Sequence, residues 1–264
     1  MPELVAQRDA FGEALVDLGA RNERVVVLDA DLASSTKVSL FAAAYPDRFF
    51  QMGVTEQNMM GVAAGLATMG FVPFTSTFAC FAAKRALDQI RISIAQPRLP
   101  VVVVGAYGSL LVGKNGKSHQ AVQDAAIMRA MPNMTVVAPG DGVEAAKAVF
   151  AVADYGGPVY LRLTRDPCPV VFDDDYEFKI GPAVVVREGS DNTLVTAMKS
   201  VDDCLEAAEM LCDRIAIIHV GKIAACGTMD ELRKGAQHGG GLEEIFLRLT
   251  GQHAARNLVD VLDA

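Results

Sequence analysis

Short apolar runs of strand length recur through the first two thirds of this chain, separated by longer segments whose apolar residues repeat every 3.6 positions. The clearest runs cover residues 25–28, 101–105, 135–138 and 159–163. Helical patterns cover residues 4–18, 78–95, 121–130 and 142–153. This alternation is typical of an α/β fold with a mostly parallel sheet and helices on both faces.

The chain has 264 residues, enough for one large or two modest domains. Residues 167–182 contain two prolines near their start, three consecutive aspartates and a closing Gly181-Pro182, a composition that indicates a linker. We therefore expect a domain at residues 1–180 and a smaller α/β unit at residues 181–264. In the smaller unit we expect strands at 193–197 and 215–219, a helix between them and a helical end.

Charge and hydropathy argue against two classes of partner. The formal net charge is −8, whereas nucleic-acid binding requires a basic face. The sequence contains neither an apolar run of membrane-spanning length nor a signal peptide, so we expect a cytoplasmic protein that does not enter membranes. The five cysteines form no C-x-x-C pair, which predicts reduced, mostly buried thiols rather than a disulfide framework or a zinc site.

Glu56 is the first candidate for chemistry. Residues 49–52 resemble a short buried strand, and Thr55 is a plausible N-cap for a helix that runs to about Met69 and is closed by Gly70. Glu56 then lies in the first helical turn, at the sheet edge where open α/β sheets bind ligands. A carboxylate there also has a purely structural explanation, because the helix dipole favours it by about 0.3–1 kcal/mol.

The rest of this helix carries small residues at helical spacing: Gly61, Ala64, Gly65 and Thr68. A glycine inside a helix costs about 1 kcal/mol relative to alanine. The stripe therefore predicts the close approach of another backbone, and most simply of another helix.

His119 belongs to a polar, glycine-bearing loop, residues 113–120, that follows the most hydrophobic strand. The loop is expected at the same sheet edge as Glu56, so His119 either faces solvent or takes part in proton transfer or binding. Phe78 and Phe81 are three residues apart and are expected to share a helix face. Together with Phe74 they are either core residues or the platform for an aromatic cofactor ring.

Nucleotide motifs are missing from the sequence, which contains neither G-x-x-x-x-G-K-[ST] nor G-x-G-x-x-G. Gly140-Asp141-Gly142 resembles the start of the magnesium and diphosphate motif of thiamine enzymes, but the asparagine that this motif requires does not follow. A turn and a helix start at residues 139–144 explain it sufficiently.

Three segments together resemble a known family. Residues 53–59 (GVTEQNM), 73–81 (PFTSTFACF) and 116–120 (GKSHQ) are similar, in order and spacing, to the pyrimidine-binding half of transketolases. The resemblance runs from the amino end to about residue 197 and includes residues 29–33 (DADLA) and 132–134 (PNM).

The resemblance implies thiamine diphosphate as the cofactor, bound across a dimer interface, with its diphosphate and a magnesium ion held by a different domain. Glu56 would hydrogen-bond the aminopyrimidine ring nitrogen and so activate the cofactor. Phe78 and Phe81 would pack on the pyrimidine, and Asp31 would also contact the cofactor. His119 would contact the hydroxyls of the sugar donor.

For Arg165 the resemblance implies the binding of substrate phosphate, for which a planar guanidinium is well suited. Three positions depart from the family pattern. Tyr107 replaces a phosphate-contacting histidine, Asn115 replaces an aspartate and Lys84 replaces a tyrosine. These changes leave the identity of the donor and acceptor sugars open.

The diphosphate-binding domain of the family has no counterpart in this sequence. The chain is therefore expected to supply half of an active site and to pair with a diphosphate-binding transketolase subunit that holds the magnesium. A dimer of heterodimers that acts on small sugar phosphates would follow.

The tail resembles another family. Residues 206–219, 227–233 and 242–249 are similar to the end of an ABC transporter ATPase. The phosphate loop is missing, and Asp203 stands where that family has its switch histidine, so no ATP hydrolysis is expected. A fusion and a rearranged reading frame both remain open.

Three classes of function follow. The first is an enzyme subunit, the pyrimidine-binding half of a split transketolase that transfers a two-carbon ketol unit. The equivalent subunit of a deoxyxylulose-phosphate synthase or a 2-oxoacid dehydrogenase is a related alternative. The second is a non-catalytic interaction module, and the third, based on the tail alone, is an ATP-binding regulatory module.

Overall fold

A computed structural model of the chain describes residues 3–110, 112–186, 196–197, 200–201, 215–219, 222–227, 231 and 234. The chain divides into two compact units, Met1–Val201 and Asp202–Ala264. The boundary between residues 180 and 181 that we expect from composition stays a prediction.

Six parallel strands form the central sheet of the first unit, in the order β3-β2-β4-β5-β7-β6. The strands are β2 (Val25–Asp29), β3 (Phe49–Gln51), β4 (Val72–Phe78), β5 (Val102–Ala106), β6 (Thr135–Val137) and β7 (Val159–Arg162). The predicted parallel α/β fold is confirmed, and five of these strands lie where the apolar runs place them.

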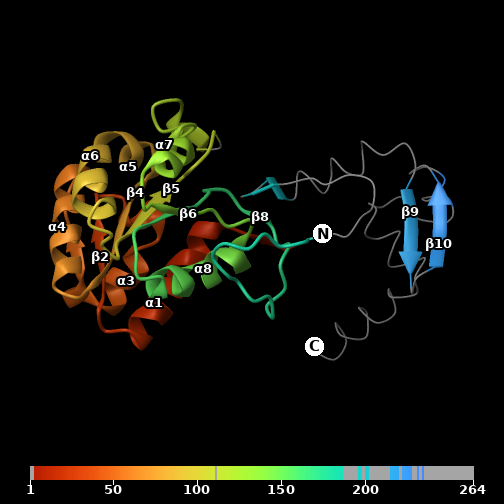
Figure 1. The fold of residues 1–264 in the computed structure, drawn as a ribbon, viewed down its shortest axis with the longest axis horizontal. Helices are drawn as coiled ribbons and strands as arrows, with labels where there is room; N and C mark the ends of the chain where they lie inside the picture. Colours follow the sequence, from red (N-terminus) through yellow and green to blue (C-terminus); the bar gives the residue numbers. More distant parts are fainter. Residues whose placement is uncertain are drawn as a thin grey trace. The chain divides into compact units, whose positions relative to one another are not determined.

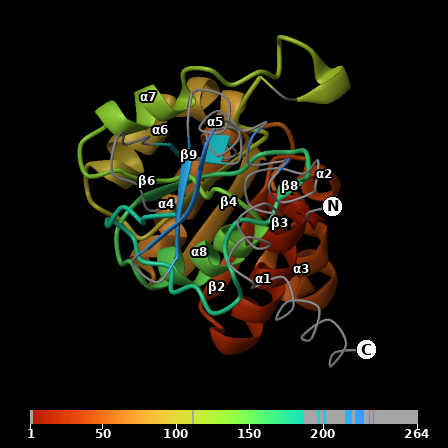
Figure 2. The same ribbon diagram turned by 90° about the vertical axis from the view of Figure 1, so that its right-hand side faces the viewer.

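Helices cover both faces of this sheet, as Figures 1 and 2 show from two directions. Val25 and Val27 of β2 pack in a core with α1, α3 and α8, whereas Val26 and Leu28 pack in a second core with α4, η2 and α7. The α-helices are α1 (Gln7–Arg21), α2 (Ala33–Thr36), α3 (Ser39–Ala44), α4 (Glu56–Thr68), α5 (Ala79–Arg85), α6 (Leu87–Gln89), α7 (Asp124–Ala130) and α8 (Gly142–Asp154). The unit also contains the short 3₁₀ turns η1 (Pro46–Arg48) and η3 (Gly113–Asn115) and the π-helical segment η2 (Ile90–Ala95).

The predicted first helix begins too early. Leu4–Val5 forms strand β1, which pairs antiparallel with β8 (Cys168–Pro169), and α1 starts only at Gln7. The same strand pairing holds the start of the predicted linker, residues 168–169, against β1. Asp141 holds the next residues by accepting hydrogen bonds from the backbone N–H groups of Val171 and Phe172. The helical period of residues 4–18 could not reveal this because strand pairing depends on a partner 163 residues away in the sequence.

Strand β4 lies in the middle of the sheet and was not predicted. Its side chains at Thr75, Ser76 and Thr77 are polar yet fully buried, which hides the apolar signature of a central strand. Phe78 ends this strand, so the expectation that Phe78 and Phe81 share a helix face is wrong. The predicted helix at 78–95 is instead divided into α5, α6 and η2.

Helix α4 starts at Glu56 and ends before Gly70, as predicted. Gly70 has a left-handed φ of +89°, and its N–H donates to the carbonyl of Ala67. The Thr55 hydroxyl donates to the carbonyl of Met52 instead of capping the helix. A Cβ at Gly61 or Gly65 would have open space around it, so among the described residues no backbone approaches this stripe.

The second unit contributes one described element, an antiparallel pair of β9 (Ile215–His219) and β10 (Lys222–Gly227). This confirms the strand expected at 215–219. The strand expected at 193–197, the helices of the tail, Asp203 and most of the ATPase-like segments fall outside the described residues. In the part of the chain that is described, no helix is long and apolar enough to cross a membrane.

The remaining sequence expectations concern Gly140-Asp141-Gly142 and the thiols. Asp141 caps α8 by accepting from the N–H of Glu144, and the Glu144 carboxylate accepts from the N–H of Gly140. The helix-start interpretation of this motif is therefore confirmed. Cys80 and Cys168 are buried, and burial raises the pKa of the Cys80 thiol.

Candidate functional site

The candidate residues follow the carboxyl ends of neighbouring strands. Asp31 comes after β2, Glu56 after β3, Phe78 at the end of β4, Tyr107 after β5 and Arg165 after β7. The chain leaves β2 for β3 on one side and continues with β4 on the other side. Such a point, where the direction of strand addition reverses, is where open parallel sheets bind ligands.

Glu56 is only 3% exposed, although it stands in the first turn of α4. Its Oε1 accepts a hydrogen bond of 2.8 Å from Nη1 of Arg85, whose side chain is 48% exposed. The Arg85 guanidinium also lies over the ring of Phe81, with 3.9 Å between Cζ and the ring centroid. Gln57 fixes the base of this arrangement by donating from Nε2 to the Arg85 carbonyl at 3.0 Å.

An aromatic cluster lies beside this pair. The ring centroids of Phe78 and Phe81 are 5.9 Å apart, and His119 meets them edge-on at 5.8 Å and 5.2 Å. Tyr107 stacks obliquely on Phe78 at 4.2 Å. The structure thus brings Glu56, through Arg85, together with both phenylalanines and His119, although these residues come from three separate segments of the chain.

Two arginines flank Tyr107. Arg8 donates from Nη1 to the Tyr107 hydroxyl at 2.6 Å, and the guanidinium carbons of Arg8 and Arg165 both lie 5.7 Å from the Tyr107 ring centroid. Arg165 also pairs with Asp166 at 2.7 Å. Arg8 was not singled out in the sequence, since it lies on α1 and is 157 positions away from Arg165 along the chain. Together they form a cationic site suited to an anion.

Asp31 is exposed and has a left-handed φ of +62°. Its N–H donates to Oε1 of Gln51, which also accepts from the N–H of Gly53 just before α4. The nearby Asp29 is buried, and its Oδ2 accepts a hydrogen bond from Nε2 of Gln51. The same oxygen accepts from the backbone N–H groups of Leu32 and Ala33. Asp29 and Gln51, both missed in the sequence, therefore connect the Asp31 loop to the turn that carries Glu56.

Burial is the largest influence on Asp29. It raises the pKa of this carboxyl above its usual value, against the lowering effect of the hydrogen bonds from Gln51 and the two N–H groups. The side chain is fully buried. Asp29 thus supports the loops around the site, and its raised pKa makes the free energy of unfolding depend on pH.

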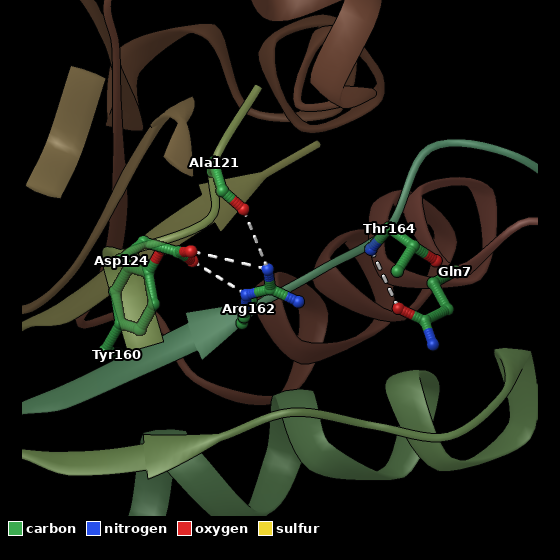
Figure 3. A network of polar contacts seen from close by, with 6 residues as sticks. All are labelled: Gln7, Ala121, Asp124, Tyr160, Arg162 and Thr164. Carbon is green, nitrogen blue, oxygen red and sulfur yellow. Dashed lines mark hydrogen bonds and ion pairs between the residues drawn. The ribbon is translucent and has the colours of Figure 1, made fainter. Parts of the chain in front are cut away.

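A second carboxylate and arginine pair anchors the opposite side of the sheet edge (Figure 3). Arg162 donates from Nε to Oδ2 of Asp124 at 2.7 Å and from Nη2 to the carbonyl of Ala121, and the Tyr160 hydroxyl donates to Asp124 at 2.8 Å. The side chains of Arg162 and Asp124 are 8% and 1% exposed. Their network fixes the start of α7, directly after the loop that carries His119.

Gln7 completes this support. Its amide donates to the carbonyl of Pro139 and accepts from the N–H of Thr164, so the start of α1 is tied to the ends of β6 and β7. Thr164 is the neighbour of Arg165, and Gln7 is the neighbour of Arg8. The hydrogen bond between Thr164 and Gln7 therefore keeps the two chain segments that carry these arginines next to each other.

Metal ligands do not gather among the described side chains: no group of three or more His, Cys, Asp or Glu residues that could hold a metal is present there. The candidate site combines the buried carboxylate of Glu56, an aromatic cluster and a pair of arginines. An uncharged heterocycle that can accept or donate a hydrogen bond fits the first two, and an anionic substrate fits the third.

Comparison with known proteins identifies the family. Residues 3–169 match the family model described as the transketolase pyrimidine-binding domain. A protein of Methanocaldococcus jannaschii, provisionally named a transketolase C-terminal section, is 41% identical over 85% of this chain and 72% of its own length. A 6-deoxy-6-sulfo-D-fructose transketolase subunit of a Clostridium species is 39% identical over 77% of this chain and 63% of its own length.

A solved structure of a split-gene transketolase, described as an inactive β4 tetramer, is also similar. It shares 49% identity and a TM-score of 0.72 over 78% of this chain and 67% of the solved chain. This chain thus spans about two thirds of the length of these relatives. It belongs to the transketolase family and corresponds to the pyrimidine-binding half of a transketolase.

Proposed function

We propose that this chain is one subunit of a two-chain transketolase that transfers a two-carbon ketol unit between sugars. Glu56 carries the proposal: it is a buried carboxylate at the start of α4, and its ion-pair partner Arg85 lies against Phe81. The diphosphate and the magnesium ion would be held by a separate subunit.

Membership of the family implies thiamine diphosphate and a divalent metal as cofactors. The described residues fit the aminopyrimidine end of that cofactor, since Phe78 and Phe81 provide an aromatic surface and Glu56 a hydrogen-bonding carboxylate beside it. When bound, thiamine diphosphate supplies the carbon nucleophile that takes up the ketol unit. Asp31, on the loop after β2, is proposed to contact the same cofactor.

Glu56 acts as the proton-sharing group at the pyrimidine ring nitrogen. A carboxyl group can play this part because it can hydrogen-bond a ring nitrogen and pass a proton along that bond. The small exposed fraction of Glu56 keeps bulk water away from this contact.

His119 and the two arginines are proposed to bind the sugar. His119 meets Phe81 edge-on at 5.2 Å, and from this position it would reach substrate hydroxyls. Arg8 and Arg165, separated by Tyr107, would hold an anionic end group such as a phosphate. Two arginine forks around one aromatic ring compensate for the histidine that Tyr107 replaces.

The partner subunit is proposed to dock along α4. Gly61 and Gly65 have open space above them, and Val54, Val62 and Met69 beside them are exposed apolar side chains. This surface begins at Glu56, so a chain that lies on it would also reach the cofactor site. That the split-gene relative is described as inactive when it forms a β4 tetramer supports a need for the second chain.

The test is reconstitution. The full chain is co-expressed with the diphosphate-binding transketolase subunit of the same genome, and ketol transfer from phosphorylated ketoses is measured with thiamine diphosphate and magnesium. We expect activity only from the complex. A stable complex that binds the cofactor but transfers no ketol unit, or the lack of any complex, would contradict the proposal and favour a non-catalytic module.

Substrate choice is tested in the same assay. Ketoses that end in a phosphate, a sulfonate or an uncharged hydroxymethyl group are compared, because both anions suit a pair of arginines and one relative is named for a sulfonated sugar. Equal kcat/KM for charged and uncharged donors would contradict the role of Arg8 and Arg165.

A further inference from the structure

Arg85 is the residue at this site whose position the proposed reaction does not explain. It ends α5, donates to Oε1 of Glu56 at 2.8 Å and places its guanidinium carbon 3.9 Å from the ring centroid of Phe81. Planar arginine groups commonly stack on aromatic faces in this way. The side chain thus bridges the buried carboxylate and the aromatic surface.

The same two contacts are required of the aminopyrimidine under the proposed function. A planar ring that hydrogen-bonds Glu56 and packs on Phe81 needs the carboxylate oxygen and the aromatic surface that the guanidinium covers here. Both groups are flat and both form hydrogen bonds at their edge. They therefore compete for one location.

The Glu56 carboxylate makes this competition direct. Its Oε1 accepts the hydrogen bond from Arg85 in the cofactor-free chain, and under the proposed function the same carboxyl group would hydrogen-bond the pyrimidine nitrogen. One of the two partners has to leave before the other can bind.

Exposure indicates which partner leaves. The Arg85 side chain is 48% exposed, so it can turn into solvent without opening the core, while the hydrogen bond from Gln57 to its backbone carbonyl stays in place. We infer that Arg85 is a displaceable latch, which occupies the pyrimidine position in the cofactor-free chain and swings away when the cofactor binds. This inference rests on the proposed function of Glu56.

The test measures binding, not turnover. Full-length chain in complex with its diphosphate-binding subunit is titrated with thiamine diphosphate and magnesium in a calorimeter. For Arg85→Gln we expect the Kd of thiamine diphosphate to fall about five-fold, which at 1.4 kcal/mol per tenfold is about 1 kcal/mol, the upper range for a partly exposed ion pair. Arg85→Lys keeps the charge but loses the flat fork, so its Kd should lie between those of Arg85→Gln and the wild type.

Arg91→Gln is the matched control. Arg91 forms an exposed ion pair with Asp88 close to Arg85 in the sequence, so this variant removes the same charge without touching Glu56. Its Kd should equal that of the wild type. Circular dichroism and gel filtration establish that each variant is folded and assembled.

The outcomes separate the latch from the proposed function. Cofactor binding by the wild-type complex, with an unchanged or higher Kd for Arg85→Gln, would overturn the latch and leave the function standing. An equal fall for Arg91→Gln would also overturn it, because the effect would then be one of net charge. A wild-type complex that binds no cofactor would overturn the proposed function and the latch together.

Discussion

The two carboxylate and arginine pairs at the carboxyl edge of this sheet differ most in the exposure of the arginine. Arg162 is 8% exposed beside Asp124, and its nitrogens are also engaged by the Ala121 carbonyl. Arg85 is 48% exposed beside Glu56. A fully buried arginine cannot leave its carboxylate without a large loss of solvation, whereas a half-exposed one can exchange its partner for water. The first pair therefore holds a loop in place, and the second leaves Glu56 available.

Replacement of Glu56 should have the largest effect on activity. Glu56→Gln keeps the shape and a hydrogen-bonding group but cannot share a proton in the same way, so we expect kcat of the reconstituted complex to fall by about 100-fold or more. Melting temperature and subunit assembly should change little. Activity close to that of the wild type would remove Glu56 from the proposed mechanism and break the contrast between the two pairs.

Removal of Arg162 should have the largest effect on stability. Arg162→Met leaves the buried carboxylate of Asp124 without its cation, which costs about 3–5 kcal/mol in comparable buried pairs. Arg85→Gln should cost about 1 kcal/mol, because water can reach the space that the side chain leaves. Urea unfolding of the two variants measures both values.

The double variant Asp124→Leu with Arg162→Met sharpens this comparison. It removes the charge and its partner together, and we expect it to be more stable than Arg162→Met alone. Equal costs for Arg162→Met and Arg85→Gln would mean that exposure does not separate the two pairs.

Arg165→Gln should affect substrate binding by an intermediate amount. Loss of a charged hydrogen bond to a phosphate costs about 1.5–3 kcal/mol, so we expect KM for a phosphorylated ketose to rise by about ten-fold or more. KM for the corresponding unphosphorylated ketose should stay unchanged, and kcat should be affected less than KM. A rise of similar size with both substrates would indicate a disturbed loop and not a lost phosphate contact.

Asp29 is a third buried carboxylate of this edge, and its replacement should have the smallest effect. Burial raises its pKa, so the folded protein binds this proton more tightly than the unfolded chain does. The contribution of Asp29 to stability is therefore greatest below its unfolded pKa and is lost as the pH rises through the higher folded pKa. We expect the stability of Asp29→Asn relative to the wild type to increase as the pH rises above about 4, the usual pKa of an aspartate.

Urea unfolding at several pH values tests this expectation. A difference between Asp29→Asn and the wild type that does not vary with pH would show that the hydrogen bonds from Gln51 and the loop N–H groups cancel the effect of burial. The Asp29 carboxyl would then titrate like an exposed one.

Local patterns in the sequence determined the parallel α/β fold, helix α4 and the position of Glu56 at its start. Hydrophobic period and glycine placement act over a few residues, and each of these features is local. The segments 73–81 and 116–120 likewise identified the family and pointed to Phe78, Phe81 and His119, while the assignment of roles to these side chains is still a proposal.

Tertiary structure alone decided the partners of these residues. Glu56 meets Arg85 because β3 and β4 lie on either side of β2, and Arg8 meets Tyr107 because the start of α1 is tied through Gln7 to the end of β7. Strand β4 escaped prediction because its buried side chains are polar and are satisfied only once the neighbouring strands are in place. Contacts of this kind depend on strand order and on the path of loops, and neither leaves a periodic trace in the sequence.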